Sequence, residues 1–363
     1  MSRDILLRIL DLARWAPSGD NTQPWRFELL TDRHLVVHGY DTREWCVYDF
    51  DGWASQFAHG ILLETLRVAA TNFDLNAVWH LRPDSEDRHP VYDVHFFDVN
   101  DLTADPLFPF IEKRVVQRRP MQTTPLSESQ RQGLTSAIGS GYTLQFFENF
   151  SVRLKLAKLL WDNAHIRLTC PEAFEVHRQI IEWGSRYSKD RIPEQAVGID
   201  PLTGKLMKWV MKKWSRVDFF NRYLLGTIPP RIQLDAIPAL MCSAHVLVCA
   251  KLPLISVIDR VNAGGAIQRL WLTVTALGLH LQPEMTPVIF RWYARSGKQL
   301  SSLSRVNQEV SQLADRLESF IPDDQSELVF LCRVGHSSEP KSRSTRKELS
   351  ELMNDGHWKW QNC

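Results

Sequence analysis

Residues 16–25 read Ala-Pro-Ser-Gly-Asp-Asn-Thr-Gln-Pro-Trp and follow a stretch with helical apolar spacing that runs from Ile5 to Trp15. Pro17 ends this helix, because the residue before a proline avoids the helical backbone conformation. A strand pattern then begins at Trp25. The turn between them places short polar side chains beside exposed backbone N–H groups. Such a turn either binds the polar edge of a flat ligand or simply connects a helix to a strand.

The same ten residues resemble the Ala-Pro-Ser-x-x-Asn-x-Gln-Pro-Trp signature of the FMN-binding nitroreductase superfamily. The matching positions are Ala16, Pro17, Ser18, Asn21, Gln23, Pro24 and Trp25. The resemblance implies an α/β (α+β) nitroreductase-like fold, with mixed or antiparallel sheets around buried central helices. It also implies that FMN contacts Pro17, Ser18, Asn21 and Gln23. In that family the turn approaches the flavin ring and ribityl chain, usually from the subunit opposite the one that holds the phosphate.

The composition limits the classes of protein that this chain can represent. Its 363 residues suffice for two domains or one large α/β unit, and the 44% hydrophobic content provides a substantial core. The net charge of +1, with no long run of one sign, does not support a nucleic-acid surface. The six cysteines include no Cys-x-x-Cys pair and are typical of buried thiols in a reducing compartment. With no signal peptide visible before the first helix, we expect a cytoplasmic protein.

One apolar run, 237–258, is long enough to span a bilayer. It contains Pro238, His245 and Lys251, which are costly inside a membrane. We therefore expect 244–250 to form a strand buried on both faces, in a protein without a membrane segment.

The remaining pattern predicts two series of elements. The first series has a helix (5–15), two strands (25–30, 34–39), a helix (53–73), two strands (77–82, 91–97) and a polar, proline-bearing connection (98–109). The second has a helix from about Ser127, a strand (142–147), helices (151–166, 171–187), an irregular and helical stretch to about 236, a strand (244–250), a helix (260–277) and a strand (327–334).

The two longest buried helices resemble each other. When Gly60 is placed on Gly264, the ungapped register also aligns Leu66 with Leu270 and Thr71 with Thr275. Any two buried helices share some apolar spacing, but several identities in one register favour an internal duplication.

The family resemblance accounts for this similarity, because nitroreductases are dimers with a central Gly-x5-Leu-x7-Gly-Leu helix. The second copy fits that pattern from Gly264 to Leu279, and the first has Asp74 at the second glycine. The resemblance implies that one chain contains two related halves. We expect a first half over 1–110, a second over 111–340 with a helical lid insertion at about 160–236, and a basic C-terminal tail over 341–363.

Two basic segments are candidates for a phosphate site. Arginine suits phosphate because its planar fork gives two parallel hydrogen bonds, although most charge clusters are solvated. The segment 114–120 resembles the family's Arg-Arg-Ser-x-Arg phosphate motif, in which Arg114 and Arg118 match and Val115 and Val116 do not. The tail after Gly335 resembles the family's closing segment with its basic phosphate contact. Its candidate phosphate ligands are Arg343 and Arg346.

The segment after the second central helix resembles the family segment whose backbone N–H groups face flavin N5. Its candidate binding residues are Gln282, Pro283, Glu284 and Met285. No side chain transfers hydride, so the chemistry is assigned to flavin N5 and no catalytic residue is assigned.

Other motifs carry less weight. No nucleophile elbow, zincin motif, dinucleotide fingerprint or P-loop is present in the sequence. His177, which lies near Glu172 and Glu175, is interpreted as part of a surface helix, and no metal site is expected. The segment 205–214 is basic and amphipathic, with a predicted stripe of Leu206, Val210, Trp214 and Val217. It is interpreted as part of a lid over the flavin, with a membrane surface as the alternative.

Together these features predict an FMN-dependent oxidoreductase of the nitroreductase type. Hydride would pass between NADPH or NADH, flavin N5 and a small organic substrate. The protein would be a monomeric pseudo-dimer or a homodimer. The alternative is a non-catalytic FMN-binding or sequestering protein. A partner protein that has lost FMN is disfavoured by the retained Ser18, Asn21, Gln23 and 282–286.

Overall fold

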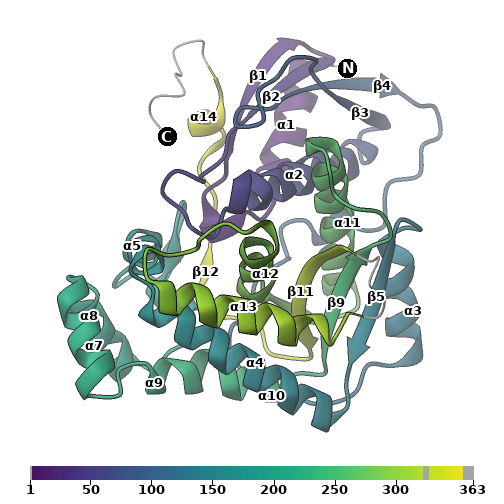
Figure 1. Ribbon diagram of the computed structural model, residues 1–363. Coiled ribbons are helices and arrows are strands. Elements are labelled where there is room, and N and C mark those ends of the chain that lie inside the picture. The colour runs from purple at the N-terminus through teal and green to yellow at the C-terminus, as the bar shows by residue number, and fades with distance from the viewer. Residues whose placement is uncertain (1, 322–326, 355–363) are drawn as a thin grey trace.

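The computed structural model describes residues 2–321 and 327–354. Within this part of the chain, two four-stranded antiparallel sheets accompany a central pair of buried helices (Figure 1). The predicted class, a mixture of helices with antiparallel sheets around buried central helices, is confirmed.

The first sheet is formed by residues near the N-terminus. Its elements in chain order are α1 (Arg3–Ala13), β1 (Trp25–Thr31), β2 (His34–Gly39), α2 (Trp53–Thr71), β3 (Leu75–Leu81) and β4 (Val91–Asp98). The strand order is β1-β2-β4-β3, and every neighbouring pair is antiparallel. α1 buries Leu6, Ile9, Leu10 and Ala13, the apolar stripe expected of a helix with one face on a core.

The second sheet has the same strand order. Its elements are α3 (Glu128–Ala137), β5 (Tyr142–Phe147), β9 (Ala244–Ala250), α11 (Val257–Ala276), β10 (His280–Pro283) and β11 (Glu327–Gly335). The order β5-β9-β11-β10 repeats that of the first sheet, and its pairs are again antiparallel. Every residue of β9 is buried, as predicted for 244–250.

Two insertions distinguish the second sheet from the first. The connection between β5 and β9 holds α4 (Phe150–Thr169), α5 (Pro171–Ile180), β6 (Ile181–Glu182), β7 (Tyr187–Ser188), β8 (Ile192–Pro193), α6 (Glu194–Val197), α7 (Pro201–Val210), α8 (Trp214–Tyr223), α9 (Ile228–Pro230), a π-helical turn (Arg231–Ala236) and α10 (Ile237–Leu240). The connection between β10 and β11 holds α12 (Thr286–Ser296) and α13 (Ser304–Glu318). In Figure 1, α4 and α13 run side by side below the central helices.

The sequence prediction missed several of these elements, including the short strands β6, β7 and β8, and misplaced one helix end. β10, α12 and α13 were not predicted, although α13 buries Val306, Val310, Leu313 and Leu317 at helical spacing. The predicted helix over 171–187 ends at Ile180, because Ile181 adopts an extended conformation and pairs with Ile192.

The central helices cross at two glycines. A Cβ atom on Gly60 would lie 1.8 Å from the carbonyl oxygen of Val261, and one on Gly264 would lie 2.1 Å from that of Phe57. Each carbonyl belongs to the residue three positions before the opposite glycine, so the two contacts mirror each other. The two contacts follow the same ungapped alignment that places Gly60 on Gly264 in the sequence. Any side chain at either glycine would force the helices apart.

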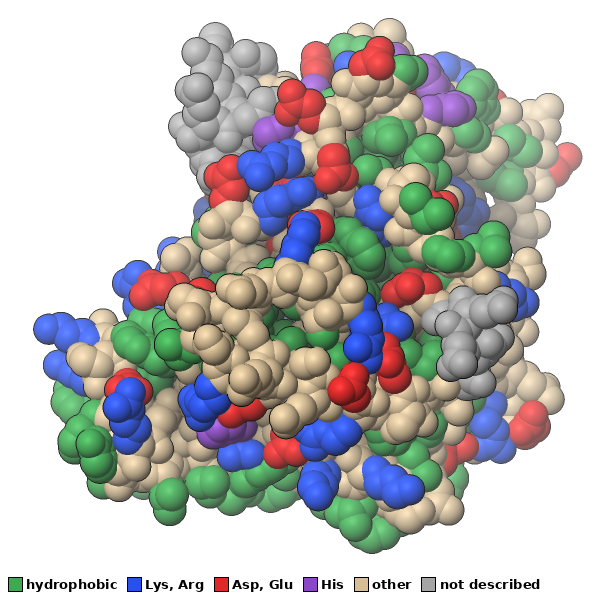
Figure 2. All heavy atoms as spheres, viewed as in Figure 1, with side chains coloured by type: hydrophobic (Ala, Val, Ile, Leu, Met, Phe, Trp, Pro, Cys, Tyr) green, Lys and Arg blue, Asp and Glu red, His purple; other side chains and the backbone are tan. Residues whose placement is uncertain are grey.

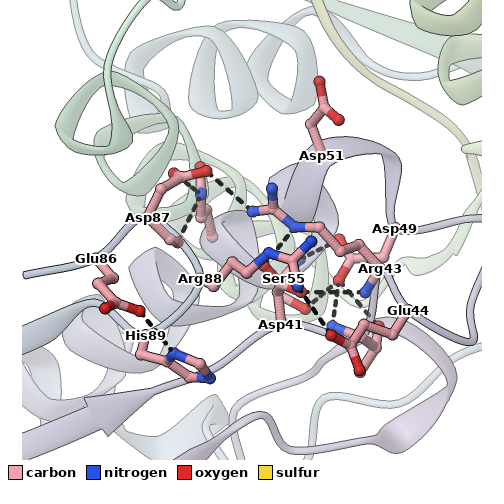
Figure 3. A network of polar contacts seen from close by, with 12 residues as sticks. Asp41, Arg43, Glu44, Asp49, Asp51, Ser55, Glu86, Asp87, Arg88 and His89 are labelled. Carbon is pink, nitrogen blue, oxygen red and sulfur yellow. Dashed lines mark hydrogen bonds and ion pairs between the residues drawn. The ribbon is translucent and has the colours of Figure 1, made fainter. Parts of the chain in front are cut away.

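A polar network fixes the start of α2 (Figure 3). The Asp49 carboxylate accepts hydrogen bonds from the backbone N–H of Ser55 at 3.1 Å and of Thr42 at 2.8 Å. Arg43 pairs with Asp41 at 2.6 Å and with Asp87 at 3.0 Å. These bonds tie the loops before α2 and between β3 and β4 to the first turn of α2, where unpaired N–H groups favour a carboxylate.

The chain returns to the first sheet after β11. β12 (Arg343–Ser344) pairs in parallel with β7, and α14 (Leu349–Leu352) precedes a bridge between Met353 and Phe27 of β1. The described part of the predicted basic tail is therefore packed on the protein. Residues 355–363 of that tail lie outside the described residues. The five described cysteines are free and buried, as predicted.

Candidate functional site

A cavity of about 450 Å³ lies where segments from both sheet units and the long insertion meet. Its volume lies in the range of small-molecule sites. Its walls come from the turn after α1, the central helices, the segments 114–118 and 282–286, the insertion and the C-terminal segment.

The turn after α1 forms one wall through Pro17, Ser18, Asp20 and Asn21. The Ser18 hydroxyl oxygen accepts a hydrogen bond from the Gln23 N–H at 2.9 Å and so closes the turn. Asp20, Asn21 and Gln23 have φ angles of 51°, 66° and 52°. Left-handed residues other than glycine are uncommon, and strained backbone of this kind concentrates at ligand sites.

Asn21 and Gln23 have different surroundings. Asn21 lines the cavity, its Nδ2 donates to the Thr345 carbonyl at 3.2 Å, and its buried Oδ1 has no partner among the described residues. Gln23 is buried but is absent from the cavity wall. Its Nε2 donates to the Lys189 carbonyl at 2.8 Å, and its Oε1 accepts from the Lys347 N–H at 2.9 Å. Gln23 thus holds the insertion and the C-terminal segment against the turn, behind the predicted contact surface.

Three arginines meet at one end of the cavity wall. Arg114 lies with its guanidinium 4.7 Å from the Trp271 ring, and Arg343 with its own 4.8 Å from the Trp15 ring. Arg346 donates from Nε to the Ala16 carbonyl at 2.9 Å. We call Arg114, Arg343 and Arg346 the arginine cluster.

Carboxylates compensate only part of the charge of the arginine cluster, because Glu112 and Glu339 favour the charged form of Arg343 without forming an ion pair with it. Within the described residues, no ion pair joins any of the three to a carboxylate, and the buried Nε atoms of Arg114 and Arg343 have no hydrogen-bond partner. Burial, then Arg346 and Arg343, holds the pKa of Arg114 well below its usual value. Burial, then Arg343 and Arg14, lowers the pKa of Arg346 to about 9. Buried donors of this kind require an acceptor, and an anion supplies both charge and oxygen atoms.

Arg118 lies in a different part of the cavity. Its charge interactions are with Asp20 and Arg333, and burial lowers its pKa to about 10. Val116, midway between Arg114 and Arg118, forms a bridge with Leu281, and four residues of fully extended chain span at most about 13 Å. The sequence motif grouped Arg118 with Arg114, whereas the structure groups Arg114 with the two C-terminal arginines.

The segment 282–285 lines the cavity as one strip. The Oε1 of Gln282 is buried without a partner in the described chain. Pro283 has no N–H, and the N–H of Glu284 donates to the Leu331 carbonyl at 2.7 Å. Among the three matching positions, only the N–H of Met285, at the N-terminus of α12, is left without an acceptor in the described part of the chain.

Glu284 belongs to a buried charge network. Its carboxylate lies 2.7 Å from Nδ1 of His245 and 3.3 Å from the Arg333 guanidinium. Burial opposes ionisation of Glu284, but His245 and Arg333 outweigh it and lower the pKa of the carboxyl. Glu284 is thus a charged partner for two other residues and shapes the cavity wall beside Arg118.

Sequence reasoning missed the polar groups on the insertion side. His177 is half-buried in the cavity wall, with Nε2 2.9 Å from the Tyr48 hydroxyl, whereas the sequence interpretation placed it on the surface. Burial, then the Arg167 charge, lowers the pKa of His177 to about 3. The glutamates near it in sequence bond elsewhere: Glu172 to Ser301 and Ser302, and Glu175 to Arg178. A signal in the sequence was available: His177 lies at helical spacing from Ala173, Phe174 and Ile180, which are on the buried face of α5.

Asp20 is a further group that the motif did not single out. Burial, partly offset by Arg118, raises the pKa of this carboxyl to about 6. A cavity-lining group that titrates near neutral pH is typical of functional sites. Within the described residues no cluster of His, Cys, Asp and Glu is arranged to hold a metal ion.

Comparisons with known proteins agree with the sequence signature over a limited region. The model of the Nitroreductase family matches residues 1–51, which contain the turn, so the predicted resemblance is confirmed there. No curated protein matches the sequence.

Several solved structures resemble this chain. The FMN-dependent nitroreductase NfnB from Mycobacterium smegmatis, in complex with NADPH, is 13% identical, covers 68% of this chain and 95% of its own, and has a TM-score of 0.38. A BluB-like flavoprotein from Clostridium difficile 630 is 13% identical over 69% of this chain and 98% of its own, with a TM-score of 0.38. The NADPH:FMN oxidoreductase of Vibrio harveyi, complexed with NAD+, is 10% identical over 70% and 79%, with a TM-score of 0.34.

Proposed function

We propose that this protein is an FMN-dependent oxidoreductase of the nitroreductase type, and that FMN occupies the cavity with its phosphate on the arginine cluster. The observation that carries this proposal is the meeting of two buried arginines, Arg114 and Arg346, with the half-buried Arg343, none of which forms an ion pair with a carboxylate in the described chain. A phosphate would relieve their mutual repulsion and accept hydrogen bonds from the unpaired Nε atoms of Arg114 and Arg343.

Other unpaired groups fit the polar edge of a flavin. The buried Oδ1 of Asn21 and Oε1 of Gln282 lack partners among the described residues, and both side chains line the cavity. Buried polar atoms are usually hydrogen-bonded, so a bound polar ligand is a reasonable completion of both. The N-terminus of α12, where the N–H of Met285 has no acceptor among the described residues, favours negative charge at the same wall.

When bound, FMN supplies the capacity to accept and release a hydride equivalent. The residues of this chain hold the phosphate, orient the flavin ring between the turn after α1 and 282–285, and exclude water through the insertion. Asp20, with its pKa raised to about 6, holds a proton in part of the molecules near neutral pH. The proposed reductant is NADPH or NADH, and the proposed oxidant is a small organic molecule.

We further propose that 1–110 and 111–340 are the two halves of a fused dimer, with 160–236 as a lid. The identical strand orders and the mirrored glycine contacts support this proposal. Ser18 and Asn21 come from the first half and Arg114 from the second, so a single chain supplies both sides of the cavity. The site therefore does not need a homodimer to be complete.

The visible spectrum of the purified protein tests the cofactor proposal. We expect flavin absorbance with one non-covalent FMN for each chain, and bleaching when NADPH or NADH is added without oxygen. Failure to bind FMN after reconstitution would overturn the proposal. Bound FMN that neither nicotinamide reduces would retain the cofactor site and favour the non-catalytic alternative.

A further inference from the structure

The helices α7 and α8 lie at one edge of the molecule (Figure 1), and several of their large apolar side chains are exposed. Leu202, Leu206 and Trp209 recur at helical spacing on one face of α7, and 78%, 49% and 47% of their surfaces are exposed. Phe219 and Tyr223 of α8 are 51% and 70% exposed. Soluble proteins rarely expose so many large apolar side chains together without a partner.

These side chains form one continuous surface across both helices. The Trp209 ring lies 6.0 Å from Phe220, which lies 6.2 Å from Phe219, and the Phe219 and Tyr223 rings are 5.2 Å apart. Figure 2 shows hydrophobic side chains together with Lys and Arg at the left edge, where α7 and α8 lie in Figure 1. We call the surface of Leu202, Leu206, Trp209, Phe219 and Tyr223 the α7–α8 face.

The opposite side of α7 is already used by the protein. Met207 and Met211 line the cavity, and Gly204 is buried. The predicted single stripe from Leu206 to Val217 is wrong, because the backbone is extended at Lys213 and separates the two helices. The α7–α8 face is therefore not the side of α7 that packs on the protein.

The α7–α8 face is bordered by positive charge. Residues 201–225 contain six Lys and Arg residues and one Asp. Arg222 pairs with Asp218 at 2.8 Å, and Arg216 stacks on Trp209 at 4.3 Å. The lysines at 205, 208, 212 and 213 form no ion pair within the described chain. A symmetric contact between two copies would set these lysines against each other, whereas an anionic surface would neutralise them.

We propose that the α7–α8 face binds the surface of an anionic lipid bilayer, with both helices lying in the interface. Leucine and aromatic side chains beside lysines are the composition of interfacial helices, since the rings enter the headgroup region while the lysines contact anionic lipids. None of the helices in the described ranges is long and apolar enough to cross a membrane, so the attachment is peripheral. This proposal does not depend on the identity of the cavity's ligand.

Vesicle sedimentation with the full-length protein tests the proposal. We expect binding to vesicles of equal parts phosphatidylcholine and phosphatidylglycerol, weak binding to pure phosphatidylcholine, and loss of binding as salt is raised. Leu206→Glu and Trp209→Glu should each weaken binding at least about tenfold, because each removes a buried apolar contact and adds repulsion. Ile255→Glu is the matched control, since Ile255 is 83% exposed but lies in the loop before α11.

The result that would overturn the proposal is a lack of binding to the anionic vesicles, or binding that Leu206→Glu leaves unchanged. A concentration-dependent dimer that Leu206→Glu dissociates, without vesicle binding, would assign the face to a second copy of the chain instead. Unchanged thermal unfolding of each variant would show that the substitutions act on the surface alone.

Discussion

Each of the two four-stranded sheets forms a unit with its central helix, α2 in the first unit and α11 in the second. The two units share the same arrangement of strands and helix but differ in the connections between strands. Both place a helix between two antiparallel hairpins in the same strand order, and their central helices cross through mirrored glycine contacts. The first unit joins β1 to β2 by the short turn Asp32-Arg33, whereas the second inserts α4 to α10 between the equivalent strands. The insertion supplies Arg167, His177 and Asp235 to the cavity. The comparison shows that a long insertion between two strands can add residues to a site without changing the sheets and the central helices.

The largest expected effect comes from separating the two units. α2 buries most of its residues and packs on α11, so a fragment of 1–110 would expose an apolar helix to water. We expect this fragment to be insoluble or unfolded when expressed alone, and to be rescued by coexpression with 111–363. A soluble fragment that unfolds cooperatively would show two independent domains and refute the fused pair.

The second-largest effect is expected from a substitution where α2 and α11 cross. Gly60→Ala would place a methyl group 1.8 Å from the Val261 carbonyl oxygen, so we expect a loss of about 3–5 kcal/mol in the free energy of unfolding, or failure to fold. Gly265→Ala is the control in the partner helix, because its Cβ would meet its nearest neighbour at 3.8 Å. This variant should be neutral or more stable by about 0.5–1 kcal/mol. Equal urea midpoints for the two alanine variants would contradict the close crossing.

The buried carboxyl of Asp20 in the first unit predicts a pH dependence. Its pKa is raised from 3.8 to about 6, so between these values the native protein binds a proton that the unfolded chain does not. The stabilisation from this group is complete below about pH 4 and is lost as the pH rises through 6.

Replacement of Asp20 by asparagine isolates this dependence. Relative to the wild type, Asp20→Asn should gain stability as the pH rises from 4 to 7, by up to about 3 kcal/mol. Urea unfolding of both proteins across this pH range measures the difference. A difference that is constant with pH would show that Asp20 does not titrate in this range.

Replacement of Arg114, the member of the arginine cluster that belongs to the second half, distinguishes an effect on ligand binding from an effect on folding. Arg114→Ala should weaken FMN binding by about 1.5–3 kcal/mol, the range for hydrogen bonds to charged groups, and should weaken riboflavin binding much less. Arg119→Ala is the matched control, because Arg119 is exposed and absent from the cavity wall. Fluorescence titration with both ligands measures the effect. Equal losses for FMN and riboflavin would mean that Arg114 acts through folding.

Local sequence patterns predicted most helices and strands of the two units and part of the candidate site. The apolar patterns predicted the four strands of the first sheet and the two buried central helices, but not how the strands pair. The turn motif singled out Pro17, Ser18 and Asn21, which line the cavity. Gln23 is absent from the cavity wall, and Arg118 interacts with Asp20 and Arg333 rather than with the arginine cluster. A linear motif does not reveal which side chains a neighbouring segment will bind. His177 and Arg167 come from the insertion, and its path over the cavity depends on contacts that no local pattern encodes.

The smallest expected effect concerns the ends of the two central helices. Gly278 follows α11 with a φ of 71°, and Asp74, at the aligned position after α2, has a φ of 56°. Asp74 therefore keeps the left-handed backbone conformation that Gly278 has in the second unit. Aspartate tolerates this conformation better than most residues but less well than glycine.

Exchanging these residues should shift stability in opposite directions. Asp74→Gly should stabilise the protein, and Gly278→Asp should destabilise it, each by less than about 1 kcal/mol. A Cβ on Gly278 would have no atom within 4 Å, so the cost is one of backbone conformation and not of packing. Gly278→Asn provides the check, since asparagine enters the left-handed region as readily as aspartate without adding charge. If Gly278→Asn were as stable as the wild type while Gly278→Asp lost stability, the difference between the two helix ends would be electrostatic and not conformational.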